Sequence, residues 1–260
     1  MLTEIEHRYG PQVHILNNVY LQSLLAKLCS PSTFQPEINH LVQVLYENIL
    51  IHAMNSAFPQ EELQEPTRMT AMHPAAFLGG NRIKKNQKII SVNIARAGTF
   101  PSHVCYHRLH DVIAPECIRQ DHIFAGRSTS ADHKVTGTEI GATKIGGDKD
   151  KSIVLFPDPM GATGNTIITA IDHYKAKVPG RELKFISLHL IVTPEYLKKV
   201  VTAHPDIAIY ALRLDRGLSS EAVLRTPPGT HWDQERGLND KDYIVPGGGG
   251  FGEIMNNSFV

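Results

Sequence analysis

Cysteine and excess charge are both scarce in this sequence. Of its 260 residues, three are cysteines, Cys29, Cys105 and Cys117, an odd number at wide spacing. This pattern excludes a disulfide framework and a paired-cysteine zinc motif, and it favours a reducing compartment. Acidic and basic side chains balance at 26 each. Proteins that bind nucleic acids or anionic membranes usually carry a basic excess, so we expect neither as a partner.

Long hydrophobic runs are missing as well. The longest apolar runs have only the length of a β-strand, so no segment is expected to span a bilayer. Residues 1–6 lack the basic and apolar regions of a signal peptide. We therefore expect a cytoplasmic protein that folds as a single domain over residues 1–260.

The middle of the chain, residues 88–214, alternates apolar runs of strand length with amphipathic runs of helical spacing. Helices are expected to begin near residues 102, 167 and 194. The expected strands are residues 89–94, 123–125, 153–156, 183–192 and 207–214. This alternation favours an α/β fold with a parallel sheet and crossover helices on its faces.

The remaining segments are less regular. Apolar spacing in the amino-terminal part, residues 1–70, predicts a helical pair at 12–29 and 37–54, followed by a loop over 58–68. Residues 126–151 are rich in Gly, Thr, Lys and Asp, and a loop of that length is usually functional or mobile.

One glycine-rich stretch follows the most apolar strand and precedes an amphipathic helix. Glycines allow a tight turn, and the free N–H groups and dipole of a helix start favour an anion. Asp158 stands where the strand ends, which is where open α/β sheets bind ligands. We therefore predict a phosphate cradle with a carboxylate at its edge, or else a connection that merely needs glycine to turn. The cradle comprises Asp158, Pro159, Met160, Gly161, Ala162, Thr163, Gly164, Asn165 and Thr166.

Arg96, Ala97 and Gly98 form a second candidate anion site, because they also follow a strand and precede a helix. Arginine adds a guanidinium group with fixed donors, although a plain turn is the commoner explanation of such a tripeptide alone. If the two preceding strands are neighbours, both loops meet at one edge of the sheet. Two facing anion sites would suit a doubly phosphorylated ligand.

The chain closes on four successive glycines, residues 247–250, within an otherwise apolar segment. Close approach of backbone to a flat ligand would explain them, and a frayed tail is the alternative. A formal GxGxxG at Gly247, Gly249 and Gly252 is not taken as a dinucleotide site, because we expect no helix to follow it.

Three histidines, His103, His107 and His110, share one face of a predicted helix. A packing or solvated face is favoured over a metal site, because no carboxylate or cysteine is placed to complete the ligands.

Together these stretches resemble uracil phosphoribosyltransferase, a type I phosphoribosyltransferase. The cradle is similar to that family's ribose-phosphate signature, and Ala95 to Gly98 is similar to its pyrophosphate loop. Residues 203–206 and 237–247 resemble its carboxyl-terminal half. The resemblance implies a parallel sheet flanked by helices, with an N-terminal helical pair. It also implies a C-terminal base-binding hood within residues 215–260.

The resemblance implies transfer of the phosphoribosyl group from 5-phosphoribosyl 1-pyrophosphate (PRPP) to uracil, giving UMP and pyrophosphate in pyrimidine salvage. Asp158 and Arg96 would be catalytic, Mg²⁺ would accompany PRPP without a dedicated protein ligand, and the protein would be a homo-oligomer. PRPP would be bound by Arg96, Ala97, Gly98, Arg127 and the nine cradle residues. Uracil would be bound by Tyr243, Ile244, Gly249, Gly250 and Phe251.

The sequence departs from the family pattern at several positions. Gly250 stands where the family has an aspartate, with a second acid at Glu253, and Gly161 and Asn165 stand where it usually shows leucine and glycine. Residues near 218–232 look inserted. These departures keep two alternatives open: a non-catalytic module that senses UMP or PRPP, and a phosphoribosyltransferase for another base.

Overall fold

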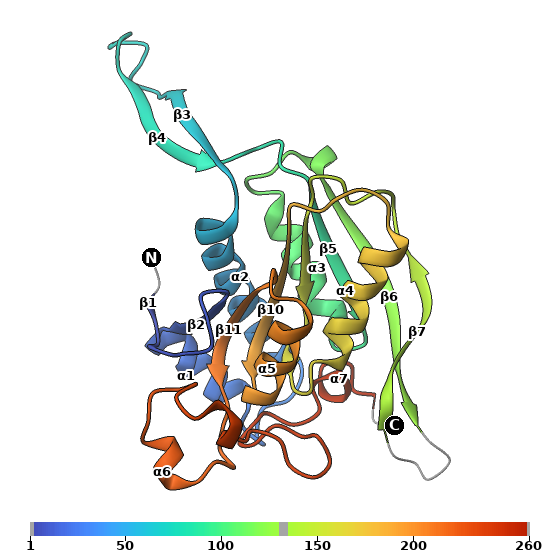
Figure 1. The fold of residues 1–260 in the computed structure, drawn as a ribbon. Helices are drawn as coiled ribbons and strands as arrows, with labels where there is room; N and C mark the ends of the chain where they lie inside the picture. Colours follow the sequence, from blue (N-terminus) through green and yellow to red (C-terminus); the bar gives the residue numbers. More distant parts are fainter. Residues whose placement is uncertain (1–2, 130–134, 259–260) are drawn as a thin grey trace.

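The computed structural model describes residues 3–129 and 135–258, without the side chains of residues 127–138. Its centre is a mostly parallel β-sheet flanked by helices, as the sequence predicts (Figure 1). The sheet runs in the order β1-β2-β11-β10-β8-β5-β6-β7, with β9 also paired to β10. These strands are β1 (Thr3–Glu4), β2 (Val13–Asn17), β5 (Ile89–Ala95), β6 (Ile118–Thr129), β7 (Val135–Lys144), β8 (Ile153–Pro157), β9 (Met160–Gly161), β10 (Lys184–Val192) and β11 (Ala208–Leu214).

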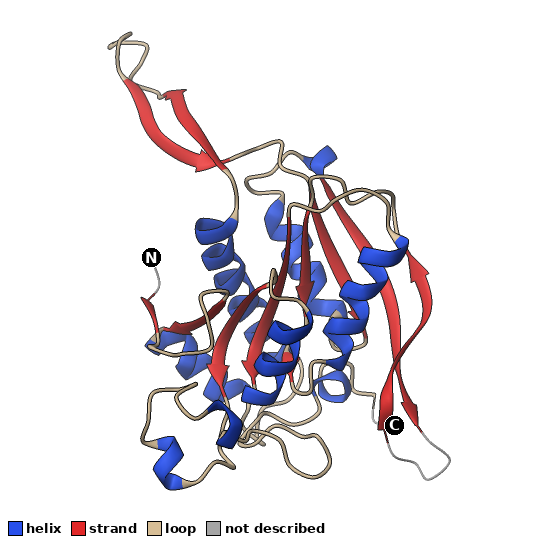
Figure 2. Ribbon diagram, in the orientation of Figure 1, coloured by secondary structure: helices blue, strands red, loops and turns tan. Residues whose placement is uncertain are grey.

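Helices cover both faces of this sheet (Figure 2). Helices α1 (Val19–Leu28), α2 (Glu37–Ala57) and α3 (Thr99–Leu109) pack on one face, and α4 (Asn165–Lys177) and α5 (Pro194–Ala203) on the other. All five residues of β8 are buried, as expected for a parallel strand covered on both sides. The carboxyl ends of the central strands therefore form the edge at which the loops before α3, α4 and α5 meet.

The first predicted helix, residues 12–29, is wrong in its first half. Residues 13–17 form β2, which extends the sheet by pairing in parallel with β11. The helix starts only at Val19, because the side chain of Asn18 caps it by accepting from the N–H of Leu21 at 2.9 Å. Helix α2 confirms the second half of the predicted pair.

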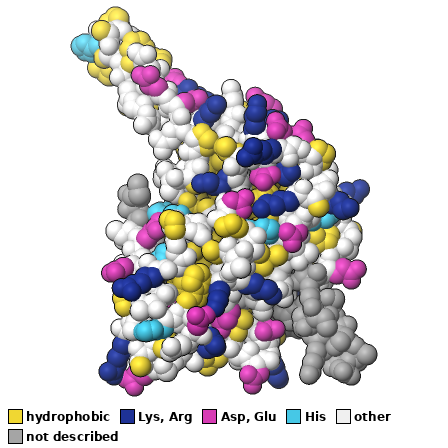
Figure 3. Space-filling view, viewed as in Figure 1, with side chains coloured by type: hydrophobic (Ala, Val, Ile, Leu, Met, Phe, Trp, Pro, Cys, Tyr) yellow, Lys and Arg dark blue, Asp and Glu magenta, His cyan; other side chains and the backbone are white. Residues whose placement is uncertain are grey.

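The loop predicted over residues 58–68 is also wrong. Strands β3 (Gln60–Pro66) and β4 (Phe77–Ile83) form an antiparallel hairpin that projects from the body as an arm (Figure 1). Both faces of the arm meet solvent, so its sequence lacks the alternation that marks a half-buried strand. Figure 3 shows hydrophobic side chains gathered on the arm, and the exposed ones include Met69, Met72, Phe77 and Leu78.

Three further expectations are corrected near the middle and the end of the chain. The strand expected at 123–125 is the longer β6, and much of the loop expected over 126–151 is β7, paired antiparallel to it. A short helix, α7 (Phe251–Ile254), follows the glycine run where none was expected, although no βαβ unit contains it. Among the described residues, no helix is both long and apolar enough to cross a membrane.

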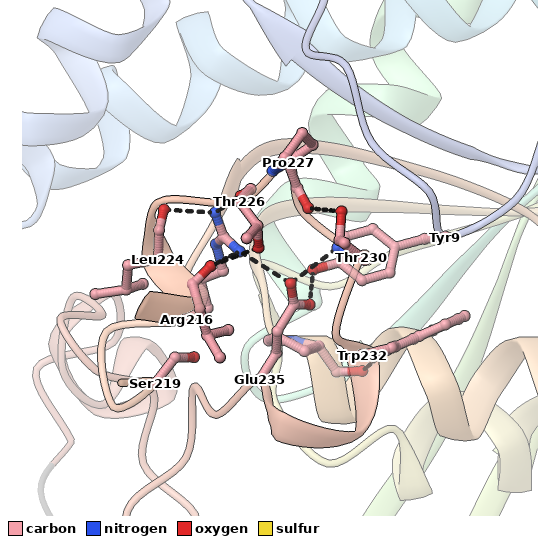
Figure 4. Close-up of polar contacts among 12 residues, drawn as sticks. Tyr9, Arg216, Ser219, Leu224, Thr226, Pro227, Thr230, Trp232 and Glu235 are labelled. Carbon is pink, nitrogen blue, oxygen red and sulfur yellow. Dashed lines mark hydrogen bonds and ion pairs between the residues drawn. The ribbon is translucent and has the colours of Figure 1, made fainter. Parts of the chain in front are cut away.

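The inserted segment is folded rather than extended, and its only α-helix is α6 (Glu221–Leu224), with a 3-10 turn at Trp232–Gln234. Arg216 donates to the carbonyl oxygens of Val223 and Thr226 at 3.2 and 2.7 Å, and to the buried carboxylate of Glu235 at 2.9 Å (Figure 4). The hydroxyl of Tyr9 donates to the other oxygen of Glu235. The segment is thereby tied to the amino-terminal part of the chain.

Candidate active site

The phosphate cradle lies at the carboxyl edge of the sheet, between β8 and α4. Its first half is fixed to the neighbouring strand, because β9 pairs with β10 and the hydroxyl of Thr193 donates to the carbonyl oxygen of Ala162 at 2.7 Å. Gly164 precedes the first turn of α4 with φ +84°, a left-handed conformation that glycine adopts at little cost. The strand, tight loop and helix start that the sequence predicts are all present.

A cavity of about 120 Å³ opens over the cradle. Most predicted cradle residues line it, from Asp158 at the strand end to Thr166 in the first turn of α4. Three further lining residues, Ile167, Tyr196 and Asp242, were not among the predicted site residues. The sequence could have indicated Tyr196, because this residue lies in the first turn of the helix that follows β10 at the same sheet edge. No local sequence feature indicates Asp242. The lining residues are Asp158, Met160, Ala162, Thr163, Gly164, Asn165, Thr166, Ile167, Tyr196 and Asp242.

Asp158 is the most strongly perturbed acid of this site. Burial raises the pKa of its carboxyl to about 6, opposed by a weak hydrogen bond from the N–H of Met160 at 3.4 Å. The backbone N–H of Asp158 donates to the carbonyl oxygen of Leu188 on β10 at 3.0 Å. Its own carbonyl oxygen bonds to Nδ1 of His189. Hydrogen bonds to Leu188 and His189 of β10 therefore fix the backbone of Asp158.

His189 joins Asp158 to Tyr196. Its Nε2 lies 2.6 Å from the Tyr196 hydroxyl, and burial lowers the pKa of the imidazole to about 3, so the ring is neutral. A carbonyl only accepts, so Nδ1 carries the proton towards Asp158 and Nε2 accepts from the tyrosine. His189 is thus a positioning group beneath the carboxylate, and the sequence alone gave no reason to select it.

Gly161 and Tyr196 fit together. A Cβ placed on Gly161 would lie 2.9 Å from Cγ1 of Val192 and 3.2 Å from two carbons of the Tyr196 ring. The ring occupies the volume that a side chain at position 161 would need. The departure from the leucine typical of the family therefore has a steric counterpart on α5.

The Arg96 loop lies beside the cradle, as predicted from the two strands. Strand β5 pairs in parallel with β8, and a Cβ on Gly98 would lie 3.0 Å from the carbonyl oxygen of Pro157. A second cavity of about 410 Å³ extends from Arg96 to the β6–β7 hairpin. It is lined by Ala95, Arg96, Phe124, Ala125, Gly126, Glu139 and Gly141. The predicted PRPP residue Arg127 is the residue of β6 after Gly126, and its side chain lies outside the described part of the structure.

The carboxyl-terminal segment reaches the Arg96 loop. The guanidinium of Arg96 donates to the carbonyl and hydroxyl oxygens of Ser258 at 3.2 and 3.1 Å, and it lies 3.8 Å from the carboxylate of Glu253. A Cβ on Gly250 would overlap Oε2 of Glu253. Glu253 therefore places a carboxylate in the space that an aspartate side chain at position 250 would enter.

None of the predicted uracil residues lines either cavity. Asp215 accepts from the N–H of Gly247 at 2.8 Å, which anchors the glycine run. Gly249 has φ +84° and open space where a Cβ would stand. The side chains of Phe251 and Ile244 are buried, so a ligand could meet only the backbone groups of these two residues. The side chain of Tyr243 is half exposed.

The histidine face has no metal-site character in the described residues. His103 and His107 lie on α3, and His110 at its end bonds through Nδ1 to the carbonyl oxygen of Tyr106 at 2.8 Å. No group of three or more His, Cys, Asp or Glu side chains able to hold a metal ion occurs in the part of the chain that is described.

Solved structures show the same fold. The AQ2163 protein from Aquifex aeolicus superposes with a TM-score of 0.67 at 21% identity, covering 94% of this chain and 97% of that one. The adenine phosphoribosyltransferase of Trypanosoma brucei gives a TM-score of 0.50 at 15% identity, with coverage of 85% and 90%. At these identities the likeness establishes the type I phosphoribosyltransferase fold.

Sequence comparison identifies the family. The uracil phosphoribosyltransferase of Variovorax paradoxus (strain S110) is 26% identical over 216 residues, 82% of this chain and 91% of that protein. That of Campylobacter fetus is 32% identical over 127 residues, 49% of this chain and 50% of its own, so the chain spans about half of this relative. The family model described as uracil phosphoribosyltransferase matches residues 15–230. The chain therefore belongs to the uracil phosphoribosyltransferase family.

Proposed function

We propose that this protein transfers the phosphoribosyl group of PRPP to uracil, giving UMP and pyrophosphate. The observation that carries the proposal is the meeting of the cradle and the Arg96 loop at one sheet edge, with a cavity at each. The 5-phosphate would bind the N–H groups at the start of α4, and Arg96 and Arg127 would hold the pyrophosphate. Family membership supports this assignment of the two anion sites.

Asp158 would act between these two sites. Its ionised carboxylate would bind the ribose hydroxyls and stabilise the positive charge that develops at the anomeric carbon as pyrophosphate leaves. Catalysis would then depend on positioning and preorganised electrostatics, with no covalent intermediate. Backbone groups of Ile244, Gly249 and Phe251, with Tyr243 and Gly250 beside them, would select uracil by its fixed donors and acceptors.

We propose Mg²⁺ as a companion of PRPP rather than as an ion in a dedicated protein site. Mg²⁺ prefers oxygen ligands, keeps several waters and commonly binds substrate phosphates. The carboxylate of Asp158 in the cradle and that of Glu253 beside Arg96 are among the acidic groups that could add oxygen ligands. When bound, the ion would neutralise charge on the departing pyrophosphate.

The assay for this proposal is formation of UMP from labelled uracil, PRPP and Mg²⁺, with a panel of other nucleobases alongside. We expect UMP well above a blank without protein. If folded protein gives no product with any base while calorimetry detects UMP or PRPP binding, the protein is a sensing module instead. That alternative is favoured by one observation, the engagement of Arg96 by Ser258 and Glu253.

We propose further that the protein is a cytoplasmic homo-oligomer in which the β3–β4 arm contacts another copy. The exposed apolar residues of the arm support this, because isolated monomers rarely leave such a patch in water. Sedimentation of the intact chain and of a variant with Met72→Ser and Leu78→Ser gives the mass of each assembly. An unchanged mass in the variant would show that the arm does not contact another copy.

A further inference from the structure

The cradle cavity is poor in positive charge for a phosphate site. Its lining carries two carboxylates, Asp158 and Asp242, and no lysine or arginine. A phosphate monoester bears about 1.5 to 2 negative charges near neutral pH. A helix N-terminus offers the equivalent of roughly half a positive charge. A cation close to the cradle would therefore contribute strongly to the binding of such a group.

Lys199 lies next to this cavity. Its ammonium donates a hydrogen bond to Oδ1 of Asn165, which is the first residue of α4 and part of the cavity lining. On helix α5, Lys199 lies three residues after Tyr196, which lines the cavity, and directly before Val200. A Cβ on Gly164 would lie 2.9 Å from Cγ2 of Val200. This stretch of α5 is therefore packed against the cradle.

Neighbouring cations are directed elsewhere. Lys198 bonds to the carboxylate of Asp233, which directly follows the inserted segment, and Nζ of Lys175 lies 3.4 Å from the carboxylate of Asp206. Lys199 instead donates to the neutral side-chain amide of Asn165, and this hydrogen bond does not neutralise the positive charge of the ammonium. Lys199 is exposed, and its flexible four-carbon stem gives the ammonium room to move.

The contact with Lys199 also fixes the orientation of Asn165. An ammonium only donates, so the asparagine atom that meets it is the carbonyl oxygen, and the NH₂ group is the other branch of the amide. Asn165 thus holds a cation on one side and has two N–H donors on the other. A glycine at this position, usual in the family, could do neither.

We propose that Lys199 is the cationic residue of the 5-phosphate site and that Asn165 holds it beside the cradle. When the phosphate monoester of PRPP enters, the ammonium of Lys199 donates to a phosphate oxygen in a charge-assisted hydrogen bond. This inference rests on the proposed function, because it assumes that the phosphate end of PRPP occupies the cradle.

Calorimetric binding of ribose 5-phosphate tests the proposal without requiring turnover. Lys199→Met should weaken the binding of ribose 5-phosphate about tenfold, the effect expected for one lost hydrogen bond to a charged group. The affinity of this variant should also depend less on salt concentration than that of the wild type. Lys199→Arg should retain most of the affinity. Lys198→Met is the matched control, because it removes the adjacent charge of the same helix, and we expect less than about a twofold change.

The outcomes separate this inference from the proposed function. Equal affinities of Lys199→Met and Lys198→Met would overturn the role of Lys199 even if the wild type makes UMP. A tenfold loss specific to Lys199→Met would support that role even if no base is ribosylated. Wild-type protein that does not bind ribose 5-phosphate at all would overturn the role of Lys199, whereas the proposed function is decided separately by formation of UMP.

Discussion

The aromatic ring of Tyr196 occupies the space beside Gly161, so that a Cβ on the glycine would meet two ring carbons at 3.2 Å. The two residues belong to different elements and are 35 positions apart in the chain. A large side chain on α5 thus accompanies a missing side chain in the cradle. Because tightly packed atoms cannot interpenetrate, neither residue is free to change alone.

Restoring a leucine at position 161 should therefore fail in the present background. We expect Gly161→Leu to cost about 1–3 kcal/mol of unfolding free energy by overpacking against Val192 and Tyr196. Adding Tyr196→Ala should recover part of this loss, giving a coupling energy of at least about 0.5 kcal/mol. Urea unfolding of the two single variants and the double variant measures it. Strictly additive effects would contradict the packing relationship.

Asp158→Asn should keep the fold but reduce turnover by a factor on the order of a hundred, as for the loss of one preorganised electrostatic group. The raised pKa, about 6, means that the carboxylate gains a proton as pH falls below that value. Wild-type kcat/KM should therefore fall below about pH 6 as the negative charge is lost, and the variant should lack this acidic limb. Steady-state rates between pH 5 and 8 measure both effects, and near wild-type turnover of the variant would remove Asp158 from the site.

The same carboxyl gives a stability prediction with a definite sign. Its folded-state pKa lies above the unfolded value of about 4, so the folded chain holds the proton more tightly. Relative to Asp158→Asn, the wild type should lose stability as pH rises from about 4 to about 6 and then level off. Urea midpoints at a series of pH values give this difference, and an opposite slope would refute the raised pKa.

Glu253 and Gly250 should behave as alternatives for one carboxylate position. If Glu253 serves PRPP binding, Glu253→Ala should raise KM for PRPP about tenfold, the size of one lost hydrogen bond to a charged group. Gly250→Asp in the Glu253→Ala background should recover much of that loss. Gly250→Asp alone should lower activity, because two carboxylates would then compete for one space. An unchanged KM in Glu253→Ala would show that this acid has no part in the site.

The Arg216–Glu235 pair should be worth far more than a surface ion pair. Arg216→Met leaves the fully buried carboxylate of Glu235 without its cation, and we expect a loss of about 3 kcal/mol or more in unfolding free energy. Burial and the neighbouring carboxylate raise the pKa of Tyr9, which remains a donor to Glu235. Arg225→Met is the matched control, because its partner Glu221 is exposed, and its urea midpoint should barely move. Equal midpoints for the two variants would count against a structural role of the network.

Several features of the fold and the site followed from local sequence. The apolar run at 153–156, the glycines of the cradle and the tripeptide from Arg96 to Gly98 each restrict the backbone within a few residues, and the structure has β8 and both loops where predicted. Parallel pairing of consecutive strand–helix units then brought the loops to one edge. Short-range sterics and hydrophobic burial were sufficient for these conclusions.

Only the tertiary structure decided the rest. Residues 13–17 became a strand because β11 offered an open edge, and an apolar spacing also compatible with a helix could not reveal that partner. Strand β10 supplies His189, helix α5 supplies Tyr196 and Lys199, and later segments supply Asp242 and Glu253. Packing and hydrogen bonds between residues of different segments bring them near the cradle and the Arg96 loop. A sequence shows which residues can bind a phosphate, whereas the folded chain determines which distant side chains stand beside it.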